Sequence, residues 1–229
     1  MEEHFKIEKP LSYYEQVYIS LKQMIFKGIF KPGDIIIESK IAEKFNVSRS
    51  PVREAIRSLE MEGLLIVDEK SKIMVYNPTL EDLEEIYICR ESLEALAGKL
   101  CCEKANSEDL STIEITLSEA ESYLENFEEK YIDTLINLNA KFHDLISEYS
   151  RNIRLQKQIS GLRSLTNFYR GTYIQKKERY FQILKEHLTI FKLIKERKPD
   201  DVYKEMQNHI RNDLEFMKKN FSKKQGDEQ

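Results

Sequence analysis

The sequence predicts a mainly α-helical protein, with an N-terminal winged helix-turn-helix followed by an all-helical bundle of about six helices. Three observations predict this fold class. Residues 39–65 carry a helix-turn-helix pattern that runs into a strand. Glycine is nearly absent beyond residue 79, where apolar residues recur with a helical period. Three of the four histidines lie on such apolar stripes in the C-terminal half.

The helix pair has recognisable start and stop signals. The first helix is expected at Ser39–Phe45, where apolar residues recur at helical spacing. Asn46 tolerates a left-handed backbone and is expected to make the turn. The second helix is expected from about Ser50 to Glu62, with Ser48 as its N-cap and Pro51 in its first turn.

The second helix has an apolar and a basic face. Its inward stripe is expected to consist of Val52, Ala55, Ile56 and Leu59, and its groove-facing residues of Arg49, Ser50, Arg53 and Arg57. Because Arg49 and Arg53 are four residues apart, one guanidinium can reach a base edge and the other a phosphate, in either order. The alternative is an ordinary helical hairpin with a solvated basic face. The complete pattern favours DNA binding.

A wing is expected after this helix. Gly63 stands at the usual left-handed cap position, and the following residues, LLIVDEKSKIMVY, indicate two short strands about a polar turn. Residues 1–76 are therefore expected to form a winged helix-turn-helix domain.

These residues resemble the DNA-binding domain of GntR transcription regulators over about Tyr14 to Tyr76. The resemblance lies in VSRSPVREAIRSLEMEGLL and the preceding GIFKPGDIIIESKIAEKFN, with a match to the SR-x-PVREAL pattern of the FadR-like branch. It implies that Arg49 and Arg53 contact DNA, helped by Ser48 and Ser50. The family usually has glycine in the wing, where this chain has Ser71 and Lys72. Lys72 is the residue expected to reach phosphate.

The charge of the two halves bears on how DNA is bound. Residues 1–76 contain 12 Lys and Arg against 12 Asp and Glu, and the remainder contains 24 against 28. A neutral domain gives little sequence-independent affinity, so specific binding is expected to need two copies on a palindromic, two-fold related DNA site. The sequence therefore predicts a homodimer whose C-terminal half is not a nucleic-acid surface.

Length and composition suit a two-domain soluble protein, since the 229 residues are 41% hydrophobic and 33% charged. No apolar run is long enough to span a membrane, and residues 1–10 lack the apolar core of a signal peptide, so a cytoplasmic location is expected.

The three cysteines form neither a C-x-x-C pair nor an even set and are expected to be reduced, with Cys89 and one of Cys101 and Cys102 in the core.

The second domain is expected at residues 77–222, with a polar, disordered tail at 223–229. Pro78 ends the wing strand, and Thr79 is followed by Asp82 in the pattern of a helix start. Six helices are expected, roughly at Thr79–Ala105, Ser107–Phe127, Glu129–Tyr149, Asn152–Thr172, Lys177–Arg197 and Pro199–Asn220.

The candidate chemistry of this domain lies in its histidines. His143, His187 and His209 each sit among apolar residues on separate expected helices, and Asn139 lies one turn before His143. Histidines on core-facing stripes can converge inside a bundle and hold a first-row metal ion. The alternative is that each is a hydrogen-bonded core residue.

The C-terminal half resembles the FCD ligand-binding domain that accompanies FadR-like DNA-binding domains. The family pattern D-x-x-F-H, then E-H, then a final His aligns with NAKFH at 139–143, with Glu186-His187 and with His209. The resemblance implies that these four positions hold a divalent ion, with a carboxylate effector in the cavity. Asn139 replaces the usual Asp; the nitrogen-rich set favours zinc or nickel. The resemblance also places Arg90 and Asn152 at the effector, although Arg90 can instead pair with Glu94 on the surface and Asn152 can be a helix cap.

Together, these features predict a homodimeric, sequence-specific transcription repressor, controlled by an organic acid bound in a metal-containing helical domain. One alternative is a metal-dependent hydrolase, because three histidines with an open coordination position can activate water. Against it, the chain has no H-E-x-x-H motif and no evident general base. The other alternative is a constitutive DNA-binding protein without an effector.

Overall fold

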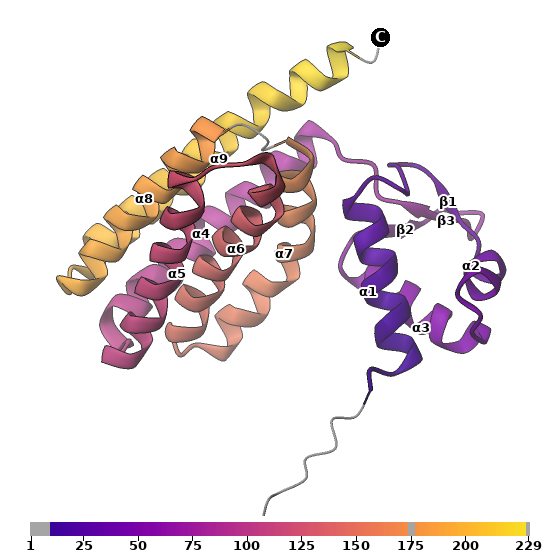
Figure 1. Ribbon diagram of the computed structural model, residues 1–229, viewed down its shortest axis with the longest axis horizontal. Helices are drawn as coiled ribbons and strands as arrows, with labels where there is room; N and C mark the ends of the chain where they lie inside the picture. Colours follow the sequence, from indigo (N-terminus) through magenta and orange to yellow (C-terminus); the bar gives the residue numbers. More distant parts are fainter. Residues whose placement is uncertain (1–9, 174–176, 228–229) are drawn as a thin grey trace, which may run out of the picture. The chain divides into compact units, whose positions relative to one another are not determined.

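The computed structural model describes residues 10–173 and 177–227. The chain divides into two compact units, Met1–Asn77 and Pro78–Gln229 (Figure 1). The division falls at the Asn-Pro step, where proline cannot continue the strand that precedes it. Each unit has its own core and is described by itself.

From residue 10 on, where the structure describes it, the N-terminal unit contains three helices and a three-stranded antiparallel sheet of order β1-β3-β2 (Figure 1). Its elements are α1 (Tyr13–Phe26), β1 (Ile35–Ile36), α2 (Glu38–Phe45), α3 (Arg49–Met61), β2 (Leu65–Val67) and β3 (Ile73–Val75). The pair α2 and α3 and the hairpin of β2 and β3 match the sequence prediction within one or two residues. Helix α1 and strand β1 were not expected from the sequence.

Helix α1 begins at a capping box that is visible in the sequence. Ser12 Oγ accepts the N–H of Glu15, and Glu15 Oε2 accepts the N–H of Ser12. The helix buries one apolar stripe, Val17, Leu21 and Ile25. It packs against α3, whose Val52, Ala55, Ile56 and Leu59 are all buried, as the sequence predicts. This packing holds the opposite face of α3 toward solvent.

The turn and the wing depend on left-handed residues. Asn46 has φ 53° between α2 and α3, and Gly63 has φ 75° after α3, as expected. Ser48 has the extended backbone of an N-cap. In the wing, Ser71 has φ 58°, and Asp68 Oδ1 accepts the N–H groups of Lys70 and Lys72. The carboxylate of Asp68 therefore supports a turn in which this family usually has glycine.

The C-terminal unit is all-helical in its described residues. Its helices are α4 (Leu80–Lys104), α5 (Ser107–Glu125), α6 (Ile132–Tyr149), α7 (Ile153–Tyr173), α8 (Lys177–Lys195) and α9 (Pro199–Asp227), with the short 3₁₀ helix η1 (Glu129–Tyr131) before α6. Six long helices agree with the expected number. Helix α9 runs through Asp227, so the tail expected to be disordered at 223–229 is helical at residues 223–227; residues 228 and 229 lie outside the described part. The reason is that its lysines and glutamine are good helix formers.

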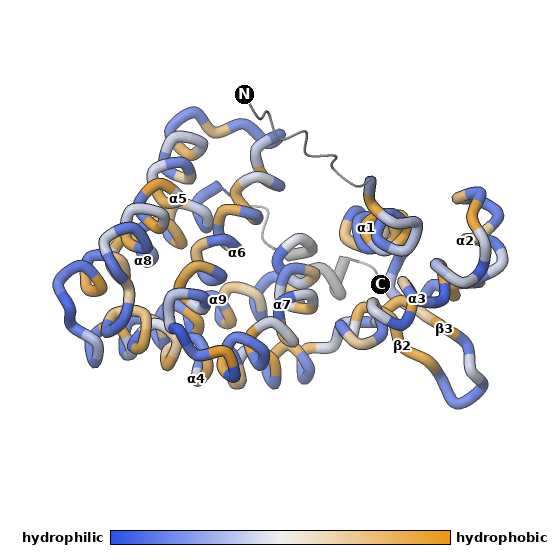
Figure 2. The backbone as a smooth tube through the Cα atoms, turned by 90° about the horizontal axis from the view of Figure 1, so that it is seen from below, coloured by the Kyte–Doolittle hydropathy of each residue, from blue (hydrophilic) through white to orange (hydrophobic). Residues whose placement is uncertain are grey.

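Helices α4 and α9, the first and last of this unit, pack along each other (Figure 1). They approach closely at Gly98, where an added Cβ would lie 3.1 Å from Val202 Cγ1. Figure 2 shows apolar and polar residues mixed along both helices. Among the described residues, no helix is long and apolar enough to cross a membrane.

The cysteines differ from the expectation. All three are free, but Cys89 is exposed, while Cys101 and Cys102 are both buried. Cys89 lies on the exposed face of α4, and the adjacent buried pair lies near the C-terminal end of that helix.

Candidate functional site

The solvent-facing side of α3 carries the residues expected to contact DNA. Ser48, Arg49, Ser50, Arg53 and Arg57 are all exposed. The apolar residues on the inner face of α3 are buried in the core of the unit. The basic face of the helix is therefore exposed to solvent. A helix presented in this way is what insertion into a major groove requires.

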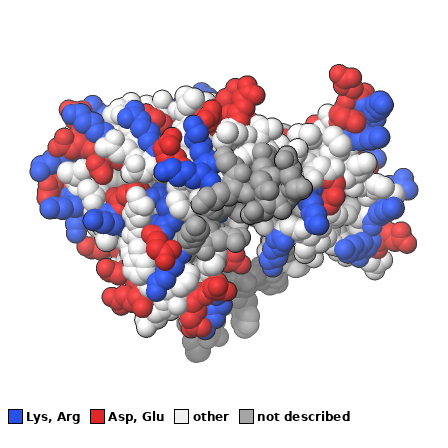
Figure 3. Space-filling view, turned by 90° about the horizontal axis from the view of Figure 1, so that it is seen from above, with Lys and Arg blue, Asp and Glu red and all other residues white. Residues whose placement is uncertain are grey.

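Arg53 is also held from within the unit. Its Nε and Nη2 donate to Glu38 Oε2 at 3.4 Å and 3.3 Å, from the first turn of α2. Lys72 is exposed beside Ser71 at the tip of the wing. Over the face drawn in Figure 3, basic and acidic side chains are interspersed, in line with the near-equal numbers of the two in the sequence.

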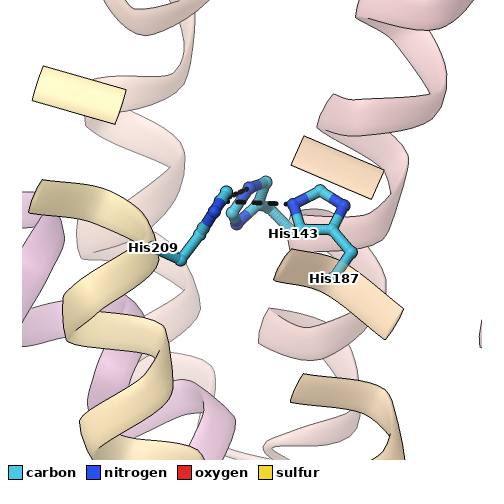
Figure 4. Close-up of side chains that lie close together, drawn as sticks. All are labelled: His143, His187 and His209. Carbon is cyan, nitrogen blue, oxygen red and sulfur yellow. Dashed lines mark hydrogen bonds between the residues drawn. The ribbon is translucent and has the colours of Figure 1, made fainter. Parts of the chain in front are cut away.

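The three histidines predicted to converge do so inside the C-terminal unit. His143 of α6, His187 of α8 and His209 of α9 point toward one another (Figure 4). The Nε2 atoms of His187 and His209 are 3.2 Å apart, and those of His209 and His143 are 3.3 Å apart. All three side chains are buried, at 7%, 2% and 1% exposure for His143, His187 and His209. Tertiary packing thus gathers three nitrogen donors at one point.

Two carboxylates stand behind the histidines. Glu94 Oε2 lies 2.6 Å from His143 Nδ1, and Glu186 Oε2 lies 2.6 Å from His209 Nδ1. A carboxylate at Nδ1 favours the tautomer with its proton on Nδ1, which leaves a lone pair on each Nε2. Two such lone pairs facing each other at 3.3 Å repel unless a proton or a cation lies between them. This arrangement is the usual support of a metal-ligating histidine.

Burial favours the neutral imidazole of His143 and of His187. It lowers the pKa of His143 to about 4, against the opposing effect of Glu94. The pKa of His187 is lowered well below its ordinary value, first by burial and then by the charge on its histidine neighbours. Neutral imidazole is the form that binds a metal ion.

Asn139 occupies the position one turn before His143 on α6. Its side chain is 7% exposed, and its Oδ1 has no hydrogen-bond partner among the described residues. Asn139 and His187 line the same small cavity between α5, α6 and α8. An unpartnered buried amide oxygen beside three convergent nitrogens fits a divalent metal ion.

A second cluster, of buried arginines, adjoins the histidines. Asp213, which is wholly buried, accepts hydrogen bonds from Tyr87 Oη at 2.8 Å, Arg170 Nη2 at 3.1 Å and Arg179 Nη2 at 3.0 Å. Although burial alone would raise the pKa of Asp213, Arg170 and Arg179 outweigh it and hold the pKa far below its ordinary value. The carboxylate is therefore ionised and balances part of the arginine charge.

Arg90 joins this cluster to a pocket beside His143. Its Nε donates to Glu94 Oε1 at 2.7 Å, so the pair expected on the surface exists but is buried. Arg90, His143, Arg163 and Arg170 line the pocket. Glu94 and Asp144 also line it, so the pocket has three arginines against two carboxylates, an excess of one positive charge that suits a small anion.

In the structure Asn152 is a helix cap, the alternative role offered by the sequence, and its contact with an effector stays a prediction. Its Oδ1 accepts the N–H of Leu155 at the start of α7. The described residues that line the pocket beside His143 do not include it. The first N–H groups of a helix lack partners within the helix, and the side chain of Asn152 supplies an acceptor for one of them.

Neither the pairing of Glu94 and Glu186 with the histidines nor the arginine cluster about Asp213 was predicted from the sequence. One signal was available for Asp213, because it lies four residues after His209 on the same buried stripe of α9. A charged residue on an apolar stripe is rare unless it is paired. Glu186 gave no such signal, because it lies at a partly exposed position, where charged residues are common.

Comparison with known proteins agrees with both units. Residues 13–75 match the family described as bacterial regulatory proteins, gntR family, and residues 85–212 match the FCD domain. The HTH-type transcriptional regulator YdhC of Bacillus subtilis (strain 168) is 39% identical over 215 residues, covering 93% of this chain and 95% of YdhC. The HTH-type transcriptional repressor RspR of Escherichia coli (strain K12) is 23% identical over 196 residues, or 86% and 85% of the two chains.

Solved structures share the fold. McbR/YncC of E. coli superposes with a TM-score of 0.76 at 22% identity, covering 93% of this chain and 100% of that one. A GntR transcriptional regulator from Rhodococcus sp. RHA1 gives 0.74 at 21% identity, with 90% and 98% covered. These relatives are transcription regulators and not enzymes, which excludes the hydrolase alternative. The chain belongs to the GntR family of bacterial transcription regulators, with a DNA-binding helix-turn-helix domain followed by an FCD effector domain.

Proposed function

We propose that this regulator is a homodimeric repressor that binds a palindromic DNA operator and responds to a small organic acid. The exposed row on α3, with Arg49 and Arg53 four residues apart, supports sequence reading in the major groove. Arg57 and Lys72 would add phosphate contacts. Because the winged unit is neutral overall, one copy alone would bind weakly, which supports binding as a dimer.

We further propose that the helical domain holds a divalent ion, zinc or nickel, through Nε2 of His143, His187 and His209, with Asn139 at its side. The observation that carries this proposal is the meeting of the three Nε2 atoms, with carboxylates behind two of the rings. The ion would supply a coordination position for the carboxylate of an effector, and Arg90 would contact the same carboxylate.

Regulation requires that the effector prefer one of two arrangements of the dimer. A ligand that binds both arrangements equally changes nothing, so it must favour the one in which the winged units are wrongly spaced for the operator. Effector binding would then release DNA, as a repressor requires.

The first test is the metal content of untagged protein, measured by elemental mass spectrometry beside a His143→Ala variant. We expect near-stoichiometric zinc or nickel in the wild type and its loss from the variant. A wild type that contains no metal and takes up none from zinc or nickel chloride would overturn the metal proposal. The protein would then be a regulator whose cavity binds a ligand directly, or a constitutive DNA-binding protein.

The DNA proposal has its own test. Random DNA would be selected on the wild-type protein, and the selected sequences would be examined for two-fold symmetry. Sedimentation of the protein with and without the selected site would give the number of chains bound. Asymmetric sites bound by single chains would overturn the dimer and the palindrome.

A further inference from the structure

Arg53 meets a carboxylate on the surface expected to face DNA. Its Nε and Nη2 donate to the same oxygen, Glu38 Oε2, at 3.4 Å and 3.3 Å. Glu38 stands in the first turn of α2, which packs against α3. The side chain of Arg53 is 55% exposed and that of Glu38 is 27% exposed. The pair therefore joins the expected recognition helix to the preceding helix, at a surface that a ligand can reach.

A carboxylate is an unusual residue to find beside an arginine that binds DNA. It repels the phosphates of DNA and so lowers the sequence-independent affinity. It also contributes little to folding, because an ion pair between exposed side chains is weakened by water and by salt. The contact with Arg53 is thus better explained by a role in binding than by a role in stability.

The contact occupies one edge of the Arg53 guanidinium. An arginine side chain has five N–H donors in one plane. The Nε–H and one N–H of Nη2 are used by Glu38. The second N–H of Nη2 and both N–H groups of Nη1 remain for another partner. Two parallel N–H groups on such an edge match the O6 and N7 atoms of guanine, the most common specific contact of arginine in the major groove.

A carboxylate on one edge also fixes the orientation of the guanidinium before DNA binds. An arginine side chain has many rotamers and loses this freedom on binding, so a side chain that is already held loses less. A held guanidinium also discriminates better, because it cannot rotate to find another acceptor when the base is wrong. A base that accepts fewer hydrogen bonds then leaves a donor unsatisfied in the interface.

We propose that Glu38 is a positioning residue for sequence reading, which holds Arg53 so that the outer edge of its guanidinium binds a guanine of the operator. The inference rests on the proposed DNA-binding function and names a residue that sets its specificity. The sequence leaves the base edge and the phosphate to Arg49 and Arg53 in either order, and the contact with Glu38 gives a base edge to Arg53. Glu38 would lower the general affinity for DNA and raise the discrimination between sequences.

The test measures discrimination as well as affinity. Full-length wild type and Glu38→Gln would be titrated, by fluorescence anisotropy, against three kinds of labelled DNA. These are the selected operator, operators in which each guanine of the half-site is replaced by adenine in turn, and DNA of unrelated sequence. A two-hydrogen-bond contact of arginine with guanine discriminates about 5- to 150-fold against the wrong base.

We expect Glu38→Gln to separate the two properties. Its affinity for unrelated DNA should equal or exceed that of the wild type, because a charge that repels phosphate has been removed. Its discrimination should fall about five-fold or more at one guanine of each half-site and stay unchanged at the others. A residue with a merely structural role would weaken binding to all of these DNAs together.

Two further variants locate the effect. Glu43→Gln removes the same charge from an exposed residue of α2 and is expected to keep the discrimination of the wild type. Arg53→Lys keeps the positive charge but lacks the planar guanidinium with its two edges. In an Arg53→Lys background, Glu38→Gln is therefore expected to cause no further loss of discrimination. Thermal unfolding of each variant checks that it is folded.

The outcomes separate the inference from the proposal beneath it. A wild type that does not prefer the selected operator to unrelated DNA would overturn the proposed DNA-binding function itself. If the wild type has this preference and Glu38→Gln discriminates equally well at every guanine, the function stands and the inference is wrong. A further loss of discrimination in the Arg53→Lys background would show that Glu38 does not act through Arg53. Weaker binding of Glu38→Gln to all DNAs would show a structural role, and either result would overturn the inference.

Discussion

His209 and Glu186 are paired across two helices, with His209 Nδ1 2.6 Å from Glu186 Oε2. Glu186 precedes His187 in the chain, so two neighbouring residues of α8 serve two different histidines of the cluster. His187 supplies its own ring to the cluster, and Glu186 orients the ring of His209 on α9. Burial favours a raised pKa for Glu186, but its contact with His209 outweighs this and lowers the pKa, so the carboxylate is ionised.

Replacing Glu186 is expected to weaken the metal site without removing a ligand. Glu186→Gln removes the charge that orients His209, and such changes typically cost about 10- to 100-fold in metal affinity. Competition with a zinc indicator measures the effect. Glu178→Gln, at an exposed residue of the same helix, is the matched control. Equal zinc affinity in the two variants would show that Glu186 does not support the ion.

Arg53→Ala is expected to abolish specific DNA binding while the protein stays folded. Loss of a base contact by arginine costs about 1–3 kcal/mol per copy, and a dimer loses it twice. Gel shifts on the selected operator, with thermal unfolding beside them, measure both properties. Lys44→Ala removes the same charge from an exposed residue of α2 and is expected to have the smaller effect. Retained specific binding by Arg53→Ala would reject α3 as the recognition helix.

Asp213→Asn is expected to destabilise the helical domain. The change leaves Arg170 and Arg179 without their buried carboxylate, and breaking a buried ion pair from one side costs about 3–5 kcal/mol. The melting temperature should fall by on the order of 10 °C for a domain of this size. Glu215→Gln, at an exposed residue of α9, controls for the loss of one charge. Equal melting temperatures would mean that the arginine cluster contributes little to folding.

The buried carboxylates of Glu94 and Asp213 determine how the stability of the helical domain changes at low pH. Burial alone would raise the pKa of Glu94 and Asp213, but the arginines outweigh it and lower both values below the ordinary 4.5 and 3.8. Below those ordinary values, the unfolded chain takes up protons that the folded chain does not. The contribution of these two carboxylates to the free energy of unfolding should therefore be complete above about pH 4.5, and it should be lost as the pH falls below that value. Urea unfolding of metal-free protein between about pH 6 and pH 3 tests this, and Asp213→Asn should show a shallower fall.

Ser71→Gly is expected to stabilise the winged domain. Ser71 has φ 58°, a backbone that costs a residue with a Cβ about 1–2 kcal/mol and glycine almost nothing. We expect a gain of about 0.5–1 kcal/mol, because glycine also gives the unfolded chain more freedom. Thermal unfolding measures the gain, and Ser71→Val should be destabilised. A loss of stability in Ser71→Gly would show that the serine side chain has a role that its backbone does not reveal.

Local patterns were enough to predict most elements of the fold. Helices α2 and α3 and the wing hairpin were predictable because apolar spacing and left-handed turn residues act over a few positions. Helix α1 carried a local signal in Ser12 and Glu15 that was not used, whereas β1, two residues long, depends on pairing with β3. The end of α9 was placed too early because a polar sequence can still form a helix where, as in KKQ at residues 223–225, its residues are good helix formers.

The sequence by itself determined which residues are candidates for binding DNA and a metal ion: the arginines of α3, His143, His187, His209 and Asn139. Their residue types and their faces on each helix follow from local periodicity. Only the tertiary structure decided that Glu94 and Glu186 stand behind the histidines, that Asp213 gathers the arginines, and that Asn152 is a cap. The physical reason is that these contacts join residues on different helices, or follow from where a helix starts, and the spacing of residues along one helix does not specify how separate helices pack.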